Sequence, residues 1–445
     1  MKSSSSSPHF STPLLLLLLL PLLLHRTESQ SPIKTVVILV LENRSFDHML
    51  GYLKQSLNPS INGLTGAECN PLSASSSSIC VSDDAGFVES DPGHSFQAVV
   101  QQIFGSSAIP SMSGFAQQAS TVSSSLPLTV MQCFDPQTLP VFSTLVDDFA
   151  VFDLIFYDFN NFLCFIRNGF SSIPGPTQPN RLFLYSATSH GATTHDPLEL
   201  LTGYPQKTIF DSLHENLHDF AVYFSTLPTT LFYARMRKLE YASKFHWFSA
   251  FGAHAKAGKL AKLSVIEPRY FDLVGAEAND DHPAHDVGNG QRLVKEVYEM
   301  LRGSPQWNES LLIVSYDEHG GFYDHVETPY VGVPNPDGMR GPAPFLFDFD
   351  RLGVRVPTIM VSPWIKKGTE ILPSPFPTRS STEIKEDSFL SEFQAELVDL
   401  ASVLNGDSIF NLHRETDKKM TVKEADAYVK SAIKNYLKAS KEAIH

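Results

Sequence analysis

The chain has 445 residues, a mass of 49.3 kDa and a formal net charge of −14. Hydrophobic residues make up 42% of it and charged residues 18%, which supports a large core and excludes a wholly disordered, collagen-like or coiled-coil protein. Because an acidic chain is repelled by phosphate backbones and anionic membranes, its bulk charge predicts no binding to nucleic acid. We therefore expect a substrate that is small, zwitterionic or bridged by a metal ion.

Residues 1–30 have the pattern of a secretory signal peptide. A Ser-rich start is followed by an apolar block from Leu14 to Leu24, which only Pro21 interrupts, and then by polar residues. The block is shorter than the ~18 apolar residues of a transmembrane helix, and no later stretch approaches that length. An uncleaved anchor is the alternative. The pattern favours cleavage and a mature chain that is secreted or held in the lumen of the secretory pathway, with no transmembrane segment.

Four cysteines are too few to form a disulfide scaffold in a chain of this length. Cys69 and Cys80 bracket a Ser-rich loop and are the pair we expect to be bridged. Cys133 and Cys164 have no evident partner in the pattern. The spacing contains no Cys-x-x-Cys and no Cys/His cluster, so it predicts no structural zinc site.

Three apolar runs predict buried strands, at 35–41, 310–316 and 356–362. Between them, residues 291–302 place apolar side chains at helical spacing. The alternation of strands and helices predicts an α/β sandwich. The first two strands end directly in acidic residues, at the place where ligands bind in open parallel sheets.

These acidic residues are the first chemical signal. Glu42 and Asn43 follow the first strand, and Asp317 and Glu318 follow the second. Their oxygens are the hard donors that Mg²⁺, Mn²⁺ or Ca²⁺ prefer, provided that the two strand ends are adjacent. The alternative is that the carboxylates cap helix N-termini, which is a common use of acidic residues there.

Histidines near aspartates in turn-rich sequence are the second signal. Such residues suit phosphate contacts, proton transfer to a leaving oxygen or metal ligation, although a surface histidine is the commoner case for any one of them. The histidines in this pattern are His94, His190, His282, His285, His319 and His325.

A rigid Pro/Gly turn at 173–181 is the third signal. It presents Thr177, a candidate nucleophile, and Arg181, whose guanidinium could clamp an anion. The alternative is that this turn has only a structural role.

Five segments carry these residues in order: 41–48 (LENRSFDH), 91–94 (DPGH), 174–181 (PGPTQPNR), 279–283 (NDDHP) and 316–326 (YDEHGGFYDHV). Together they resemble the plant non-specific phospholipase C family, which is grouped with bacterial phospholipases C and acid phosphatases. The resemblance covers most of the chain after residue 30. It implies an alkaline-phosphatase-like α/β/α sandwich, with a phosphoesterase domain at 31–365 and a mainly helical C-terminal region at 366–445.

The family's activity is hydrolysis of the glycerol-side phosphodiester bond of phospholipids such as phosphatidylcholine and phosphatidylethanolamine, at a membrane surface. By matching motif, the nucleophile would be Thr177. The resemblance assigns phosphoryl contacts to His94, His282 and His285, and one divalent metal ion to Glu42, Asn43, Asp317 and Glu318. From the turn and the histidine pattern, we expect Arg181 and His190 to bind the substrate. The sequence leaves the identity of that ion, and whether it is required, open.

Two stretches depart from the family pattern. Residues 154–169 form a Phe-rich insertion that looks like translated intron and could displace Thr177. After Thr369, a segment with a Glu-His-Ser-Ser sequence is missing, and the shortened region continues into an expected helix with Phe389 and Phe393 on its apolar face. An acid phosphatase-type phosphomonoesterase and an inactive product of an altered gene model are therefore the alternative functions.

Overall fold

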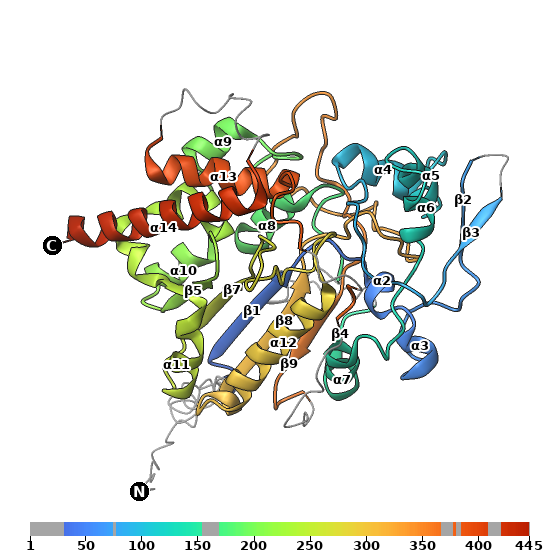
Figure 1. Ribbon diagram of the computed structural model, residues 1–445. Coiled ribbons are helices and arrows are strands. Elements are labelled where there is room, and N and C mark those ends of the chain that lie inside the picture. The colour runs from blue at the N-terminus through green and yellow to red at the C-terminus, as the bar shows by residue number, and fades with distance from the viewer. Residues whose placement is uncertain are drawn as a thin grey trace, which may run out of the picture.

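A seven-stranded sheet forms the centre of the protein (Figure 1). The computed structural model describes residues 31–73, 77–153, 169–365, 377–379, 384–407 and 420–444. In spatial order the strands are β4 (Ala150–Val151), β9 (Thr358–Val361), β8 (Ser310–Tyr316), β1 (Thr35–Leu41), β7 (Leu263–Glu267), β5 (Phe220–Phe224) and β6 (Phe245–Trp247).

The middle of the sheet is parallel, and its edge beyond β8 is antiparallel. β1 pairs in parallel with both β7 and β8, and β5 pairs in parallel with β7 and β6. β9 runs antiparallel to β8, and β4 antiparallel to β9. The segment 317–357, which leads from β8 to β9, is fully described and contains no helix that would return the chain to the other end of the sheet. A strand reached in this way enters the sheet in the opposite direction.

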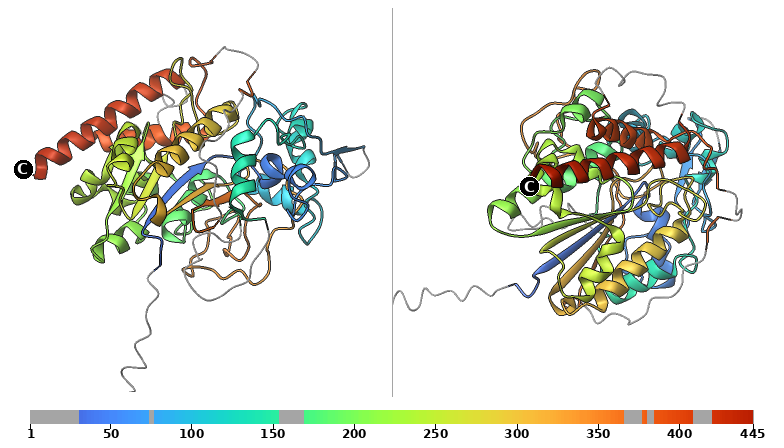
Figure 2. Two further views of the ribbon diagram at one scale, coloured as in Figure 1. Left: turned by 90° about the horizontal axis from the view of Figure 1, so that it is seen from below. Right: turned by 60° about the vertical axis from the view of Figure 1, so that its left-hand side comes forward.

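Helices cover both faces of the sheet, which confirms the predicted α/β/α sandwich. One face packs against α7 (Pro140–Asp148), α11 (Phe251–Lys256) and α12 (Val287–Arg302). The other packs against α8 (Thr177–Ser186), α10 (Ile209–Glu215), α13 (Glu392–Asn405) and α14 (Val422–Ile444). The right-hand view of Figure 2 shows the sheet between these two layers, and the C-terminal helices α13 and α14 confirm the predicted helical extension.

Two predicted helices begin at different residues than expected. The helix expected at 291–302 starts at Val287, because the Asp286 side chain caps it by accepting from the Gly288 N–H. The helix α13 starts at Glu392, where Ser391 and Gln394 form a capping box. Phe389 therefore lies outside the helix with 74% of its surface exposed, so its expected place on the apolar face is wrong.

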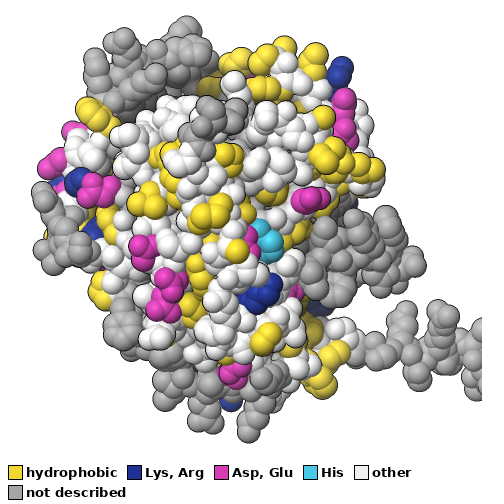
Figure 3. Space-filling model, turned by 90° about the vertical axis from the view of Figure 1, so that its right-hand side faces the viewer, with side chains coloured by type: hydrophobic (Ala, Val, Ile, Leu, Met, Phe, Trp, Pro, Cys, Tyr) yellow, Lys and Arg dark blue, Asp and Glu magenta, His cyan; other side chains and the backbone are white. Residues whose placement is uncertain are grey.

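A smaller region lies to one side of the sheet and contains α4 (Phe96–Phe104), α5 (Phe115–Ser120), α6 (Leu126–Thr129) and the hairpin of β2 (Cys69–Pro71) and β3 (Ser78–Cys80) (Figure 1). The expected disulfide between Cys69 and Cys80 is present and joins the two hairpin strands. Cys133 is free and buried, and Cys164 lies outside the described residues. Figure 3 looks at this side and shows scattered hydrophobic side chains among mostly uncharged ones.

The remaining helical elements are short. They are α2 (Phe46–Leu50), α3 (Leu53–Ser56), α9 (Pro197–Thr202) and the 3₁₀ turns η2 (Thr229–Phe232), η3 (Ala234–Arg237), η4 (Leu239–Lys244), η5 (Phe248–Ala250) and η6 (Trp307–Glu309). Among the described residues, no helix combines the length and the apolar character needed to cross a membrane. The expected signal segment and residues 154–168 of the expected insertion at 154–169 lie outside the described residues.

Candidate active site

The carboxyl ends of β1 and β8 lie side by side, because these two strands pair in parallel along their whole length. Glu42 and Asn43 leave one strand, and Asp317 and Glu318 leave the other, so the sheet brings the four predicted residues together. All four are buried, and the Asn43 N–H donates to Asp317 Oδ1 at 3.2 Å. The adjacency that the sequence left open is therefore present.

A close approach of two turns fixes the backbone of Asn43. Its φ of 58° is left-handed, a conformation that asparagine tolerates better than most residues. Gly320 packs so tightly here that a Cβ on it would lie 2.2 Å from the Asn43 carbonyl oxygen. Its N–H donates to Glu318 Oε2 at 2.8 Å. Only glycine fits at 320, which explains the first glycine of the DEHGG segment.

Thr177 is the first residue of α8, and its side chain points at Asn43. The Thr177 hydroxyl donates to Asn43 Oδ1 at 3.2 Å, and the residue is 3% exposed. Asn180 holds the Pro/Gly turn in place, because its amide donates to the carbonyls of Gly175 and Pro176. The described part of the chain therefore places the candidate nucleophile in the cluster, although residues 154–168 precede it.

Arg181 lies one turn further along α8 and joins it to both strand ends. Its Nε donates to Asp317 Oδ2 at 2.9 Å, and a terminal nitrogen donates to Glu42 Oε1 at 3.0 Å. Its other terminal nitrogen donates to the Tyr270 hydroxyl at 3.3 Å. All three nitrogens contact protein groups, so the guanidinium neutralises buried carboxylates here instead of facing solvent as an anion clamp.

The carboxylates outnumber the cation that pairs with them. Burial holds the pKa of Glu42 well above its ordinary value although Arg181 opposes the shift, and burial raises the pKa of Asp317 to about 6. Asp280 adds a fourth carboxylate near Glu42, and Glu318 Oε1 is buried without a hydrogen-bond partner. A set of hard oxygen donors with excess negative charge and a free buried oxygen fits a divalent cation.

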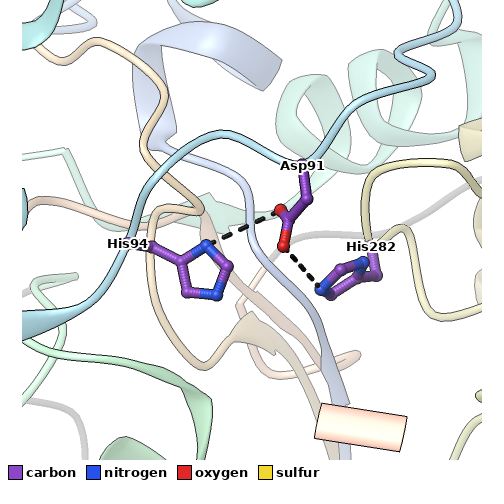
Figure 4. A group of neighbouring side chains, drawn as sticks. All are labelled: Asp91, His94 and His282. Atoms are coloured by element: carbon purple, nitrogen blue, oxygen red, sulfur yellow. Dashed lines mark ion pairs between the residues drawn. The ribbon is translucent and has the colours of Figure 1, made fainter. Parts of the chain in front are cut away.

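Asp91 lies between two of the predicted histidines (Figure 4). Its Oδ1 is 3.6 Å from His94 Nδ1, and its Oδ2 is 3.7 Å from His282 Nε2. The other edge of the His94 ring points to the carboxylate cluster, and its Nε2 lies 3.5 Å from the Asn43 side-chain nitrogen. These three side chains could also hold a metal ion.

The two histidines have opposite pKa shifts. Burial alone would lower the pKa of His94, but Asp91 and Glu318 outweigh it and raise the value to about 9. Burial lowers the pKa of His282 below its ordinary value despite Asp91. Near neutral pH, His94 is therefore the cationic ring and His282 the neutral one.

His285 and His190 do not contact the carboxylate cluster as His94 does. His285 Nδ1 lies 2.6 Å from Asp280 Oδ1, and the backbone carbonyl of Asp280 accepts from the Glu42 N–H, so His285 is one residue removed from the cluster. His190 follows α8 at a left-handed turn, and its N–H donates to Thr188 Oγ1. Within the described chain, no contact joins His190 to the other candidate residues.

A second group that could hold a metal ion is made of Asp47, which follows β1, and of Asp324 and His325, which follow β8. Arg355 already fills it, with donors 2.8 Å from Asp47 Oδ1 and 3.1 Å from both Asp324 oxygens. His325 Nδ1 is 2.6 Å from Asp47 Oδ2. The contacts assign this group to holding the segments after β1 and β8 and before β9 together.

The helix α13 reaches α8 through a contact that the sequence did not predict. His195 lies 3.4 Å from both Glu396 Oε1 and Asp399 Oδ2, and its Nδ1 is 3.5 Å from the side-chain nitrogen of Gln178. Gln178 directly follows Thr177. Asp91 and Asp280 were also missed, although both stand beside predicted histidines, whereas nothing in the local sequence points to Glu396.

The sequence is similar to known proteins of one family. The model of the Phosphoesterase family matches residues 33–382. Non-specific phospholipase C6 of Arabidopsis thaliana is 54% identical over 477 residues, covering 93% of this chain and 89% of the relative, and Non-specific phospholipase C1 of the same organism is 47% identical, covering 93% and 87%. Phospholipase C B of Mycobacterium tuberculosis is 26% identical, covering 75% and 68%.

The chain belongs to the Phosphoesterase family and is a hydrolase of phosphoester bonds. Its predicted place among the plant non-specific phospholipases C is confirmed. The alignment with the first of these relatives is longer than the chain itself, so the relative has residues that this chain lacks.

The contact between His195 and Glu396 predicts a pH effect on stability. Burial raises the pKa of Glu396 from 4.5 to about 8 against the pull of His195, while Glu392 and Asp399 raise it further. His94 also faces it and lowers it. Between about pH 4.5 and pH 8, the folded state binds more protons than the unfolded state at Glu396. The free energy of unfolding therefore falls as pH rises through this range. The pKa of His195 is also raised, which acts in the same direction.

We expect the melting temperature of the Glu396→Gln variant to fall less than that of the wild type between about pH 5 and pH 9, because glutamine does not titrate. Thermal unfolding by circular dichroism measures this. Glu89→Gln, at an exposed carboxylate, serves as the control and should follow the wild type. Equal slopes for Glu396→Gln and the wild type would contradict the prediction.

Proposed function

We propose that this protein is a phospholipase C that hydrolyses the glycerol-side phosphodiester bond of phospholipids at a membrane surface. The observation that carries the proposal is the buried Thr177 hydroxyl, held by Asn43 at the paired ends of β1 and β8. The relatives that are 42–54% identical to this chain are named as non-specific phospholipases C, which supports the substrate class. Phosphatidylcholine and phosphatidylethanolamine are the substrates we expect.

In the first step, Thr177 Oγ1 attacks phosphorus, and the bond from phosphorus to the diacylglycerol oxygen breaks. Asn43 holds the hydroxyl in place for this attack. The leaving oxygen takes a proton from His94, the imidazole nearer to Asn43. The Thr177 proton passes to His282, whose Nδ1 donates to the Pro283 carbonyl and leaves Nε2 as the acceptor. Diacylglycerol leaves, and the phosphorylated head group stays on Thr177.

In the second step, water attacks the same phosphorus atom, and the bond to Thr177 Oγ1 breaks. His94, now neutral, accepts the proton of the water, and His282 returns its proton to the threonine oxygen. The phosphorylated head group is released. Both histidines end in their starting states, so the cycle balances.

A divalent cation fits the oxygen donors of Glu42, Asn43, Asp317 and Glu318. When bound, such an ion would supply positive charge to the phosphoryl oxygens and lower the pKa of the attacking hydroxyl. Arg181 limits the negative charge of the same carboxylates from the other side. The positive charges of Arg181 and of a bound ion would therefore offset the acidic residues, which would otherwise repel a phosphodiester.

Thr177→Ala should lower the release of diacylglycerol from phosphatidylcholine vesicles by at least about a thousandfold, because the variant has no nucleophile at this position. The measurement uses purified protein that begins near Ser31, with and without EDTA. Thr177→Ser keeps a hydroxyl and should retain part of the activity. Turnover of a soluble phosphomonoester alone by the folded wild type would favour an acid phosphatase, and no turnover of either substrate would favour an inactive product.

We also propose that the chain works in the secretory pathway or outside the cell. The disulfide between Cys69 and Cys80 supports an oxidising compartment. Of its two Asn-x-Ser sequons, the one at Asn43 is buried in the site, whereas Asn308 is exposed. Asn308 is therefore the acceptor we expect to carry a glycan.

The full-length chain produced in plant cells should migrate faster on a gel after treatment with an N-glycosidase. Asn308→Gln should abolish this shift, because it removes the exposed acceptor. A wild type that carries no glycan and stays in the cytosolic fraction would contradict the proposed location.

A further inference from the structure

An apolar groove of about 340 Å³ runs along one face of the sheet, between the strands and the helices α8 and α10. Its floor is built from residues of neighbouring strands that share one face, since Leu311 of β8 is the register partner of Val36, and Ile313 of β8 that of Met360. The further apolar lining residues are Ile38, Phe170, Leu184, Ile209, Leu213, Leu263 and Val356.

Among the described residues, the groove is a gap in the cover of this face. Val36, Leu311 and Met360 remain partly exposed in it. Their chain neighbours Leu312 and Ile359, which point to the α12 face, are 0% and 1% exposed. Apolar surface left open to water favours an apolar occupant, because burial stabilises by about 25 cal/mol per Å².

Apart from Ser172, the polar side chains of the lining already have hydrogen-bond partners within the protein. Ser315 Oγ lies 2.7 Å from Thr358 Oγ1, and Ser171 Oγ donates to the Val354 carbonyl. Asn180 is taken up by the turn before Thr177. A ligand in the groove would therefore find few free hydrogen-bonding partners along its length, which excludes a sugar or a nucleotide and fits a hydrocarbon chain.

The two ends of the groove differ, and one of them lies at the candidate active site. Lys262, which precedes β7, lies at one end, where the strands begin. Asp317 and Asn180 line the other end, where Asp317 belongs to the carboxylate cluster and Asn180 braces the turn that presents Thr177. The seven residues of β8 span ~23 Å at about 3.3 Å per residue, which is long enough for an extended acyl chain.

We propose that this groove binds an acyl chain of the lipid substrate or of the diacylglycerol product. The proposal rests on the proposed phospholipase C function and deepens it, because it links the site at the strand ends to the length of the acyl chain. Long-chain lipids would bury their hydrocarbon against the sheet, whereas short-chain lipids would leave the groove unfilled. The enzyme should therefore prefer long acyl chains beyond what vesicle binding alone produces.

The first test is direct binding of cis-parinaric acid, a fatty acid whose fluorescence rises in apolar surroundings. The wild type should bind it, and palmitic acid should displace it. Leu311→Trp and Met360→Trp narrow the groove and should each weaken binding by about tenfold or more. Leu198→Trp, at a residue that is 65% exposed on α9, is the matched control and should bind like the wild type. Thermal unfolding identifies any variant that fails to fold, and the other variant then serves.

Two results would overturn the proposal. One is unchanged binding in both folded groove variants. The other is no binding to the wild type together with binding to a variant that lacks residues 154–168. The residues flanking that segment lie against the groove, since the Phe152 N–H donates to the Thr358 carbonyl and Gly169 accepts from the Val356 N–H. Binding only without the segment would mean that the chain's own residues fill the groove.

The second test compares turnover of dihexanoyl- and dipalmitoylphosphatidylcholine in the same detergent micelles. The long-to-short ratio should fall several-fold in Leu311→Trp and stay at the wild-type value in Leu198→Trp. An unchanged ratio in folded Leu311→Trp would contradict the acyl-chain role. Failure of the proposed function would look different, since the folded wild type would then release no diacylglycerol from either lipid while parinaric acid still bound.

Discussion

The structure depends on one buried guanidinium. Arg181 bonds to Glu42 at the end of β1 and to Asp317 at the end of β8, and the helix that carries it begins with Thr177. Removing one partner of such a buried ion pair costs about 3–5 kcal/mol, because a charge is left without compensation. The same contacts thus hold the two strand ends and the helix of the proposed nucleophile in a single geometry.

The balance of charge around Arg181 determines which groups a substrate would meet in the site. One cation faces Glu42 and Asp317, while Glu318 and Asp280 stay close and keep the cluster acidic. A second source of positive charge comes from the other side, where Asp91 keeps His94 in its cationic form. A phosphodiester that enters between these groups meets a hydroxyl, a cationic imidazole and oxygen donors suited to a metal ion, which together supply the parts of a phosphoryl transfer.

Local pattern predicted the parts of the site that come from one segment each. The apolar runs before Glu42 and Asp317 predicted the strands. The proline-flanked turn presented Thr177 only as a candidate, and the family resemblance assigned it the role of nucleophile. Pairing of β1 with β8 is a long-range property, so the sequence could state adjacency only as a condition. The same limit hid the role of Arg181, whose partners lie 139 and 136 residues away in the chain. Glu396 was beyond prediction because only tertiary packing brings α13 to His195.

The central claim is that Thr177 carries the head group between two chemical steps. The most direct test is to mix the enzyme with phosphatidylcholine, quench with acid within the first turnover and examine its peptides by mass spectrometry. The account predicts a phosphocholine group on the peptide that contains Thr177, which disappears when the reaction is left to finish. Full activity with no modified peptide at any quench time, or modification of another residue, would contradict it.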